Sequence, residues 1–102
     1  MVQAQRSPTM DGQIVDLPLP YEDVSELLVI ADSSNNRILL VDAKTNTFLE
    51  QVGTGRSGYK EGAFSEAEFS MPQGMCHFVD PEGSHCLMVC DVKNHLMREV
   101  NL

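Results

Sequence analysis

The sequence has 102 residues, which is enough for one small domain with a modest hydrophobic core. Seven basic side chains against fifteen acidic ones give a net charge of −8. This charge disfavours a nucleic-acid partner, because binding to phosphates depends on clustered lysine and arginine. A transmembrane helix needs about 18 or more consecutive apolar residues and a signal peptide needs an apolar core, and the sequence offers neither. We therefore predict a cytoplasmic protein with reduced thiols and no membrane partner.

The first 25 residues form a polar, acidic segment with three prolines and little hydrophobic periodicity. Within this segment only Gln13-Ile14-Val15 has the composition of a strand. Residues 1–25 are therefore expected to form a polar N-terminal segment with one candidate strand near 13–15.

Two short apolar runs follow, at residues 27–31 and 37–41, and the turn-forming stretch DSSNN separates them. Runs joined in this way predict a β-hairpin. Each run is apolar on both of its faces, which predicts strands covered on both sides and sheets that stack face to face. The strands predicted in this part are 26–31, 37–42 and 47–52.

The hairpin pattern recurs downstream. Asp91 follows Asp32 by 59 residues, and Asn94 follows Asn35 by the same interval. A hairpin repeated at such a spacing indicates a propeller or an array of stacked repeats. We interpret these residues as turn builders, because aspartate accepts hydrogen bonds from backbone N–H groups ahead of it and asparagine tolerates the left-handed conformation. The strands predicted in the second unit are 74–79, 85–90 and 96–101.

A glycine-rich segment connects the two units and contains the spacing G-x-G-x-x-G at Gly53, Gly55 and Gly58. This motif indicates a dinucleotide site only where a helix follows it, and here Gly62 lies where the first helical turn would be. No cofactor is therefore expected. We interpret the four glycines as positions that let the chain leave one sheet and cross to the next, since glycine adopts positive φ without a Cβ clash.

The rest of the connector is expected to contain one short helical turn at 65–69, with Ser65 as its N-terminal cap. Phe64 and Phe69 are expected to attach the connector to apolar surface between the two units. The other side chains predicted at that interface are Leu28, Ile30, Ile38 and Leu40 from the first unit and Met88, Cys90 and Met97 from the second.

Three cysteines and three histidines raise the question of a metal site: Cys76, Cys86, Cys90, His77, His85 and His95. Cys86 and Cys90 lie in the strand-like run CLMVC, where four residues at about 3.3 Å each separate them by roughly 13 Å. A disulfide and a tetrahedral zinc site both need a shorter separation. We interpret the cysteines as apolar packing residues and predict no metal site and no catalytic residue.

The second unit contains Asn94-His95-Leu96, and the two units have the sequences VIADSSNNRILLVD and MVCDVKNHLMREVNL. Both are similar to the repeat core of the NHL-repeat family of β-propellers. The stretch GTGRSGYKEGAFSEAEFSMPQG resembles the connector of the branch of that family in which a thioredoxin-like domain precedes the propeller. The residues that match this connector are Phe64, Phe69, Pro72 and Gly74, the last two at the start of the next inner strand.

The resemblance covers roughly residues 26–102 and implies an all-β fold of antiparallel strands: two NHL-type blades of an incomplete β-propeller. Residues 26–62 would be the first repeat with its glycine-rich connector, and residues 63–102 the second repeat without its outer strand. A closed propeller has about four to eight blades, so we expect a fragment of a longer protein. The sequence has no C-x-x-C motif, so any thioredoxin-like domain would lie outside it.

The resemblance also implies a non-catalytic scaffold for protein interaction. Its expected partners are another protein or further propeller blades, supplied by repeats of its own or by other copies. We expect the isolated chain to self-associate, because strand 96–101 would expose an unpaired edge. Two alternatives stay open: part of a metal-dependent propeller enzyme that acts on peptidyl hydroxyglycines, and an RNA-binding NHL module, which the negative charge disfavours.

Overall fold

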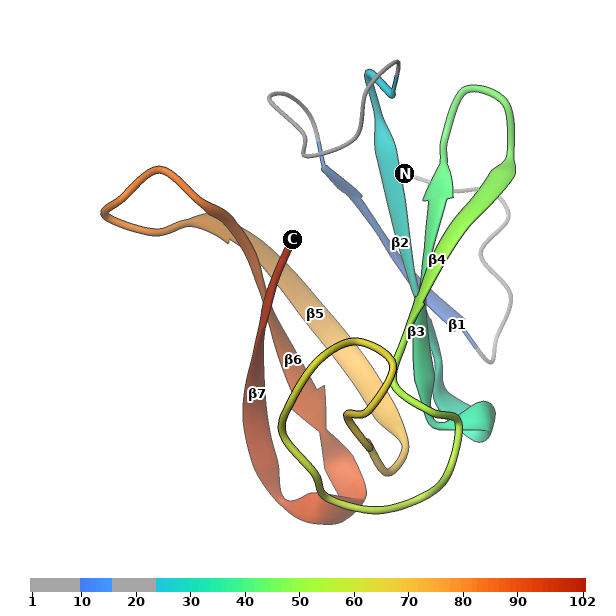
Figure 1. Ribbon diagram of the computed structural model, residues 1–102, viewed down its shortest axis with the longest axis vertical. Helices are drawn as coiled ribbons and strands as arrows, with labels where there is room; N and C mark the ends of the chain where they lie inside the picture. Colours follow the sequence, from blue (N-terminus) through green and yellow to red (C-terminus); the bar gives the residue numbers. More distant parts are fainter. Residues whose placement is uncertain (1–9, 16–23) are drawn as a thin grey trace.

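The computed structural model describes residues 10–15 and 24–102, and these form two antiparallel β-sheets (Figure 1). The first sheet has the strand order β1-β2-β3-β4 and the second has the order β5-β6-β7. The strands are β1 (Met10–Val15), β2 (Leu27–Asp32), β3 (Arg37–Asp42), β4 (Thr47–Val52), β5 (Pro72–Val79), β6 (His85–Asp91) and β7 (Leu96–Asn101). The all-β prediction is confirmed, and β3 and β4 have the predicted bounds.

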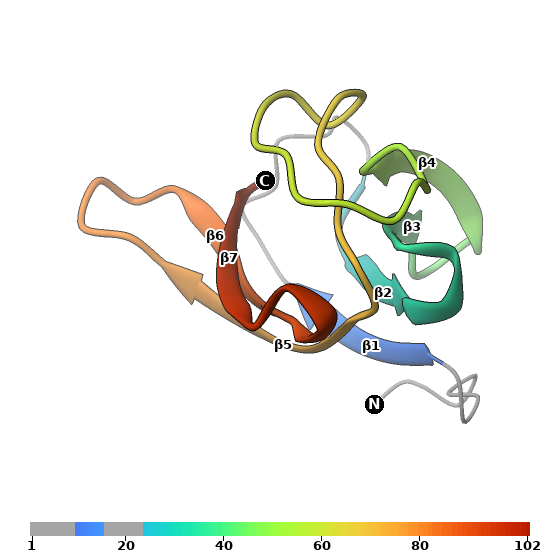
Figure 2. The ribbon, with the colours of Figure 1, turned by 90° about the horizontal axis from the view of Figure 1, so that it is seen from below.

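Strand β1 extends further than the sequence indicated and pairs with β2 along its whole length. It is the first strand of a four-stranded sheet, so this sheet begins before residue 26. Strands β1 and β5 lie side by side where the two sheets meet (Figure 2). Each sheet thus places its first strand against the first strand of the other.

The turn between β2 and β3 and the turn between β6 and β7 are each a short 3-10 helix, η1 (Ser33–Asn35) and η2 (Val92–Asn94). The residue with left-handed backbone is the next one along: φ is 56° at Asn36 and 58° at His95. Asn35 and Asn94, which the sequence analysis interpreted as turn builders that tolerate this conformation, each lie one residue before it. Each 3-10 turn must end before the chain can reverse into the following strand, so the left-handed residue comes after it.

A hydrophobic core joins the two sheets. Burying a large aliphatic or aromatic side chain stabilises a fold by about 1.5–3 kcal/mol. The core cluster is made of Leu27, Val29, Ile38, Leu40, Val52, Ala67, Phe69, Leu87, Val89 and Val100, and Phe64 packs against it. The prediction that Ile38, Leu40 and both connector phenylalanines lie at this interface is correct.

The side chains of the other predicted interface residues face away from the interface between the two sheets. Val29 pairs with Leu40, so the odd-numbered residues of β2 face the second sheet, whereas Leu28 and Ile30 face away from it. In the second sheet Leu87, Val89 and Val100 face the first sheet, and the side chains predicted there (Met88, Cys90 and Met97) lie on the opposite face. Side chains alternate along a strand, and a run that is apolar on both faces does not reveal which face is which.

The connector, residues 53–71, runs over one end of both sheets (Figures 1 and 2). It contains no helix at 65–69; instead the N–H groups of Glu66 and Ala67 both donate to the carbonyl of Ala63, which closes one turn at 63–67. Ser65 lies inside this turn and does not cap it. The turn ends because Glu68 pairs with Lys60 in an antiparallel bridge, which draws the chain into an extended conformation.

In the part of the chain that the structure describes, no helix is long and apolar enough to cross a membrane.

Candidate functional site

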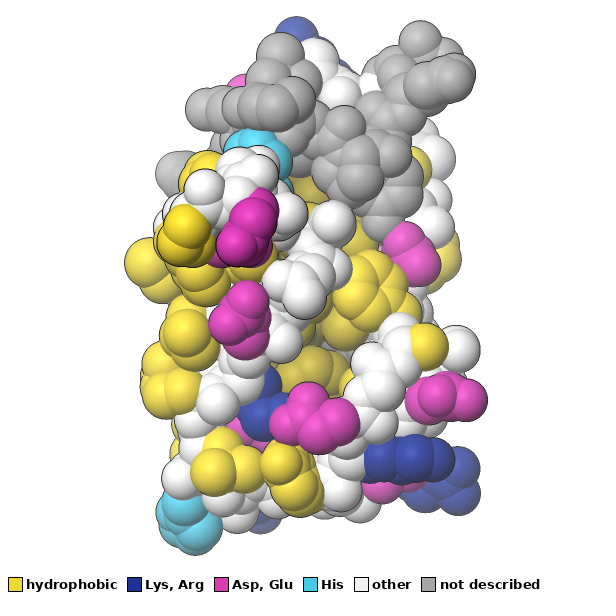
Figure 3. Space-filling view, turned by 60° about the vertical axis from the view of Figure 1, so that its left-hand side comes forward, with side chains coloured by type: hydrophobic (Ala, Val, Ile, Leu, Met, Phe, Trp, Pro, Cys, Tyr) yellow, Lys and Arg dark blue, Asp and Glu magenta, His cyan; other side chains and the backbone are white. Residues whose placement is uncertain are grey.

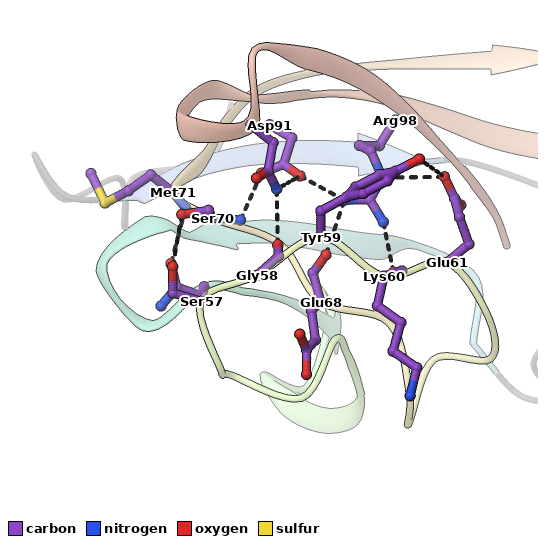
Figure 4. Close-up of polar contacts among 12 residues, drawn as sticks. Ser57, Gly58, Tyr59, Lys60, Glu61, Glu68, Ser70, Met71, Asp91 and Arg98 are labelled. Atoms are coloured by element: carbon purple, nitrogen blue, oxygen red, sulfur yellow. Dashed lines mark hydrogen bonds and ion pairs between the residues drawn. The ribbon is translucent and has the colours of Figure 1, made fainter.

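A buried carboxylate holds the connector against the second sheet (Figure 4). Asp91 is fully buried at the end of β6, and one of its oxygens accepts a hydrogen bond of 2.7 Å from the backbone N–H of Ser70. The other oxygen accepts from Asn94 Nδ2 at 2.7 Å and from Arg98 Nη1 at 2.6 Å. A buried charge destabilises a protein unless it is paired and hydrogen-bonded, and Asp91 is both.

Arg98 extends this network to the far side of the connector. Its side chain is only 5% exposed and donates to the carbonyls of Glu68 at 3.0 Å and Lys60 at 2.9 Å. The guanidinium lies 4.8 Å from the ring centroid of Tyr59 and 4.7 Å from that of Phe69, which are cation–π distances. Arg98 therefore joins the two strands of the Lys60–Glu68 bridge to the second sheet.

Asn94 completes the contact, because its side-chain amide also donates to the carbonyl of Gly58 at 2.9 Å. The aspartate and asparagine of the second turn thus bind a segment that precedes them in the sequence. The prediction that Asp91 accepts from N–H groups ahead of it was wrong, since neither turn has a side-chain cap. We call Asp91, Asn94 and Arg98 the connector clamp.

The first hairpin carries a similar set of residues in a more exposed setting. Asp32 accepts from Asn35 Nδ2 at 3.1 Å and forms an ion pair with Arg37 at 2.8 Å. Asn36 contacts the connector by accepting from the N–H of Met71 at 3.0 Å. Both turns therefore bind the C-terminal end of the connector, Asp91 at Ser70 and Asn36 at Met71.

The predicted connector glycines occupy positions that restrict the side chain. At Gly53 φ is 97°, and a Cβ atom there would lie 2.9 Å from Phe69 Cδ2, so the residue needs both the conformation and the space that glycine provides. Pro72 is buried at the start of β5, next to a shift in the β5–β6 register. The remaining predicted positions are Gly55 and Gly62, which have positive φ, Gly58, which packs against Glu68, and Gly74, which lies beside Cys90.

Sequence reasoning missed Arg98, Tyr59 and Asn36 as parts of the network. One signal was available for Arg98. Arg98 lies on the same face of a strand as Leu96 and Val100. A lone arginine on an apolar face indicates a buried partner.

A polar pocket of about 480 Å³ lies beside the first turn and the start of the connector. We call it the arginine pocket; its lining residues are Asn35, Arg37, Gln51, Thr54, Gly55 and Arg56. Arg37 donates to Asp32 at 2.8 Å and to Gln51 Oε1 at 3.2 Å, which fixes its guanidinium. Arg56 is largely exposed and lies 3.5 Å from Glu68.

The histidines and cysteines belong to the second sheet and its 3-10 turn. His77 Nε2 lies 2.8 Å from His85 Nδ1, and the two rings stack at 5.0 Å. All three cysteines are free thiols, and burial, followed by the carboxylates of Asp80 and Glu99, raises the pKa of the Cys86 thiol. Among the residues described, no group of three or more His, Cys, Asp or Glu side chains is arranged to hold a metal ion.

The two antiparallel sheets stack with their first strands adjacent, and the connector crosses both. This arrangement is that of two β-propeller blades. No protein-family model matches the chain. The chain is 42% identical over 77 residues to NHL repeat-containing protein 2 of Gallus gallus, a match that covers 76% of this chain and 10% of that protein. It is 36% identical over 81 residues to the protein of the same name from Homo sapiens, covering 79% and 10%.

A third relative is Protein SUPPRESSOR OF QUENCHING 1, chloroplastic, of Arabidopsis thaliana, which is 34% identical over 75 residues. That match covers 74% of this chain and 7% of the relative. The chain belongs to the NHL-repeat family, and it spans about a tenth of the length of the curated relatives that it matches.

Proposed function

We propose that the chain is a non-catalytic part of an NHL-repeat propeller and acts as a cytoplasmic scaffold for protein–protein interaction. The observation that carries this proposal is the role of its buried charges: Asp91 and Arg98 bind the backbone of the connector. Charges engaged in this way fix the conformation of a loop. Loops that are already ordered lose less entropy when a partner binds, which favours a role in binding. The free thiols suit a reducing compartment.

The arginine pocket is the surface that we assign to the partner. It lies where the first turn meets the connector, two segments that the hydrogen bonds of Asn36 join together. An arginine has five N–H donors, and the bonds of Arg37 to Asp32 and Gln51 use two of them. The guanidinium can therefore still bind a carboxylate. We propose that the partner inserts an acidic side chain here.

Capture of proteins by the immobilised chain tests this assignment. A double variant, Arg37→Glu with Arg56→Glu, reverses the charge of the pocket. The matched control, Lys44→Glu with Lys93→Glu, makes the same change at exposed residues that do not line it. We expect proteins bound by the wild type and the control to be lost from the pocket variant and to be released by salt. Equal capture by all three chains would contradict the assigned surface.

The alternative of a metal-dependent lyase makes a different prediction. A lyase would release glyoxylate from a peptidyl hydroxyglycine when zinc is added. Release above the buffer rate that a chelator abolishes would contradict the scaffold proposal.

A further inference from the structure

The arginine pocket is positively charged in a chain whose net charge is −8. Two arginines line it, and no Asp or Glu side chain is among its lining residues, although the chain has fifteen acidic residues and seven basic ones. Figure 3 shows basic side chains gathered at the lower right of one face, at the end of the molecule over which the connector runs, whereas acidic side chains are spread over that face. The composition of the pocket therefore favours an anionic ligand.

Arg37 is a donor group with a fixed position in this pocket. Its Nε donates to Asp32 at 2.8 Å, and its Nη1 donates to Gln51 Oε1 at 3.2 Å. Gln51 is held in turn, because its Nε2 donates to the carbonyl of Gly53 at 2.8 Å. A guanidinium has five N–H groups, so three are left for a ligand. These three donors are oriented before any ligand binds.

Arg56 is a second donor group, and its position can change. Its side chain is 80% exposed, and its Nε lies 3.5 Å from Glu68 Oε2. Exposed ion pairs contribute little to stability, so Arg56 can exchange Glu68 for another anion. The backbone N–H of Arg56 donates to Thr54 Oγ1 at 3.1 Å, which leaves the hydroxyl proton of Thr54 as a further donor.

Gly55 keeps the pocket open between these donors. A Cβ atom at this position would lie 3.6 Å from the carbonyl oxygen of Asn35 and 3.9 Å from Gln51 Nε2. Asn35 and Gln51 both line the pocket, so a side chain at residue 55 would enter it. The volume of about 480 Å³ therefore depends on glycine at this position.

The pocket is also accessible where a preceding repeat is present. Leu96 follows Arg37 by 59 residues and is its equivalent in the second unit. Leu96 is 42% exposed although the connector binds its turn through Asn94. A connector that reached the first turn from a preceding repeat would leave the position of Arg37 open in the same way.

Two guanidinium groups at one pocket suit a dianion with three acceptor oxygens. A carboxylate has one charge and two oxygens, and a single guanidinium satisfies it in a bidentate pair. A phosphate monoester carries a charge of about −1.5 to −2 at pH 7 and three acceptor oxygens, so it can accept from both arginines. A nucleic-acid backbone requires a larger cluster of basic residues, and two of the seven in this chain line the pocket.

We propose that the acidic group bound in the arginine pocket is a phosphorylated serine or threonine side chain of a protein partner, with its phosphate between Arg37 and Arg56. This proposal deepens the scaffold function given above and rests on it. The scaffold then binds its partner after a kinase has modified that partner, and a phosphatase reverses the binding.

Titration of the purified chain with capped tripeptides, followed by NMR of the arginine Nε–H signals, tests the proposal. The probes are acetyl-Gly-Xaa-Gly-amides in which Xaa is phosphoserine, glutamate or serine. We expect the phosphoserine peptide to bind at least about fivefold more tightly than the glutamate peptide, because its phosphate accepts from a second guanidinium. The serine peptide should give no saturable change.

Variants assign the preference to the two arginines. Arg56→Gln removes one guanidinium and should reduce the affinity for phosphoserine to that for glutamate. Arg37→Lys keeps the charge but loses the planar donor pair, and should weaken the binding of both peptides. Lys44→Gln, at an exposed residue outside the pocket, is the matched control for Arg56→Gln and should bind like the wild type. Thermal unfolding of Arg56→Gln should match the wild type, since its side chain is mostly exposed.

Inorganic phosphate and a short single-stranded oligouridylate distinguish the possible sources of the phosphate. Tighter binding of inorganic phosphate than of the phosphoserine peptide would overturn the proposal and indicate a site for the free anion. Tighter binding of the oligouridylate would overturn it in favour of RNA. Equal affinities for the phosphoserine and glutamate peptides, or a preference for phosphoserine that persists in Arg56→Gln, would also contradict it.

Phosphatase treatment of the protein extract used for capture separates this proposal from the scaffold function. We expect the treatment to abolish the capture that depends on the pocket arginines. Capture that needs these arginines but persists after the treatment would leave the scaffold function standing and would contradict phosphate recognition. Capture that is independent of the pocket arginines would contradict the assigned surface itself.

Discussion

The β2–β3 turn and the β6–β7 turn carry the same aspartate–asparagine pair in different surroundings. Asp91 is fully buried with Arg98, which is 5% exposed, whereas the side chain of Asp32 is 14% exposed and that of Arg37 is 34% exposed. The connector passes over the second turn and excludes water from the clamp. At the first turn the connector contacts Asn36 and leaves Arg37 exposed in the arginine pocket. A motif therefore acquires its energetic importance from the segment that covers it.

The largest expected effect is the loss of the buried pair. Asp91→Ala would leave the guanidinium of Arg98 buried without its carboxylate, which destabilises a protein by about 3–5 kcal/mol. Asp32→Ala breaks a more exposed pair and should cost about 0–1 kcal/mol. Chemical denaturation of both variants measures the difference, and Asp91→Asn separates the loss of charge from the loss of volume. Equal losses of unfolding free energy for Asp32→Ala and Asp91→Ala would contradict the expected difference between the buried and the exposed pair.

A second contrast uses equivalent positions on the two sheets. Ile38→Ala removes a fully buried side chain from the core and should cost about 2–5 kcal/mol. Met97→Ala makes a similar truncation at the equivalent position, where the side chain is mostly exposed, and should cost below about 1 kcal/mol. The unfolding free energies should be measured at a concentration where the chain is monomeric. A cost for Met97→Ala equal to that for Ile38→Ala would contradict the difference in burial.

A smaller effect distinguishes Asn36 and His95, the left-handed residues that end the two 3-10 turns. His95→Gly should stabilise the fold by up to about 1 kcal/mol, because glycine relieves the left-handed strain. Asn36→Gly relieves the same strain but removes the hydrogen bonds to Met71 and Gly55, and each such bond contributes about 0.5–1.5 kcal/mol. We expect opposite signs in thermal unfolding. Stabilisation by both substitutions would show that the Asn36 bonds contribute nothing.

The smallest effect is on thiol reactivity and leaves stability unchanged. Because the pKa of Cys86 is raised, a smaller fraction of this thiol is ionised at a given pH, and the thiolate is the reactive form. Alkylation followed by mass spectrometry should label the exposed Cys76 before Cys86. The alkylation rate of Cys86 should rise only at a higher pH. Burial and the nearby carboxylates of Asp80 and Glu99 both disfavour the thiolate. Equal alkylation rates of Cys76 and Cys86 at pH 8 would contradict the buried, negatively charged surroundings of the Cys86 thiol.

The sequence by itself determined the strands after residue 26, the turns between them and the 59-residue repeat. These features depend on neighbours in the chain: alternating or continuous apolar runs predict strands, and clusters such as DSSNN predict turns. That is why β3 and β4 were predicted with their observed bounds and why the two hairpins were recognised as copies. The glycine at position 53 was also predicted, because crossing between sheets requires positive φ.

Only the tertiary structure decided which way the side chains point and what they bind. Leu28 and Val29 are neighbours of the same chemical type, and only the arrival of the second sheet on one side makes Val29 a core residue at the sheet interface. Arg98 finds Lys60 and Glu68 more than 25 positions earlier in the chain, a contact that no local pattern encodes. Strand β1 likewise lies in a polar segment, and its place in the first sheet comes from pairing with β2. Burial and long-range hydrogen bonds depend on the whole fold, and they distinguish the clamp at Asp91 from its exposed counterpart at Asp32.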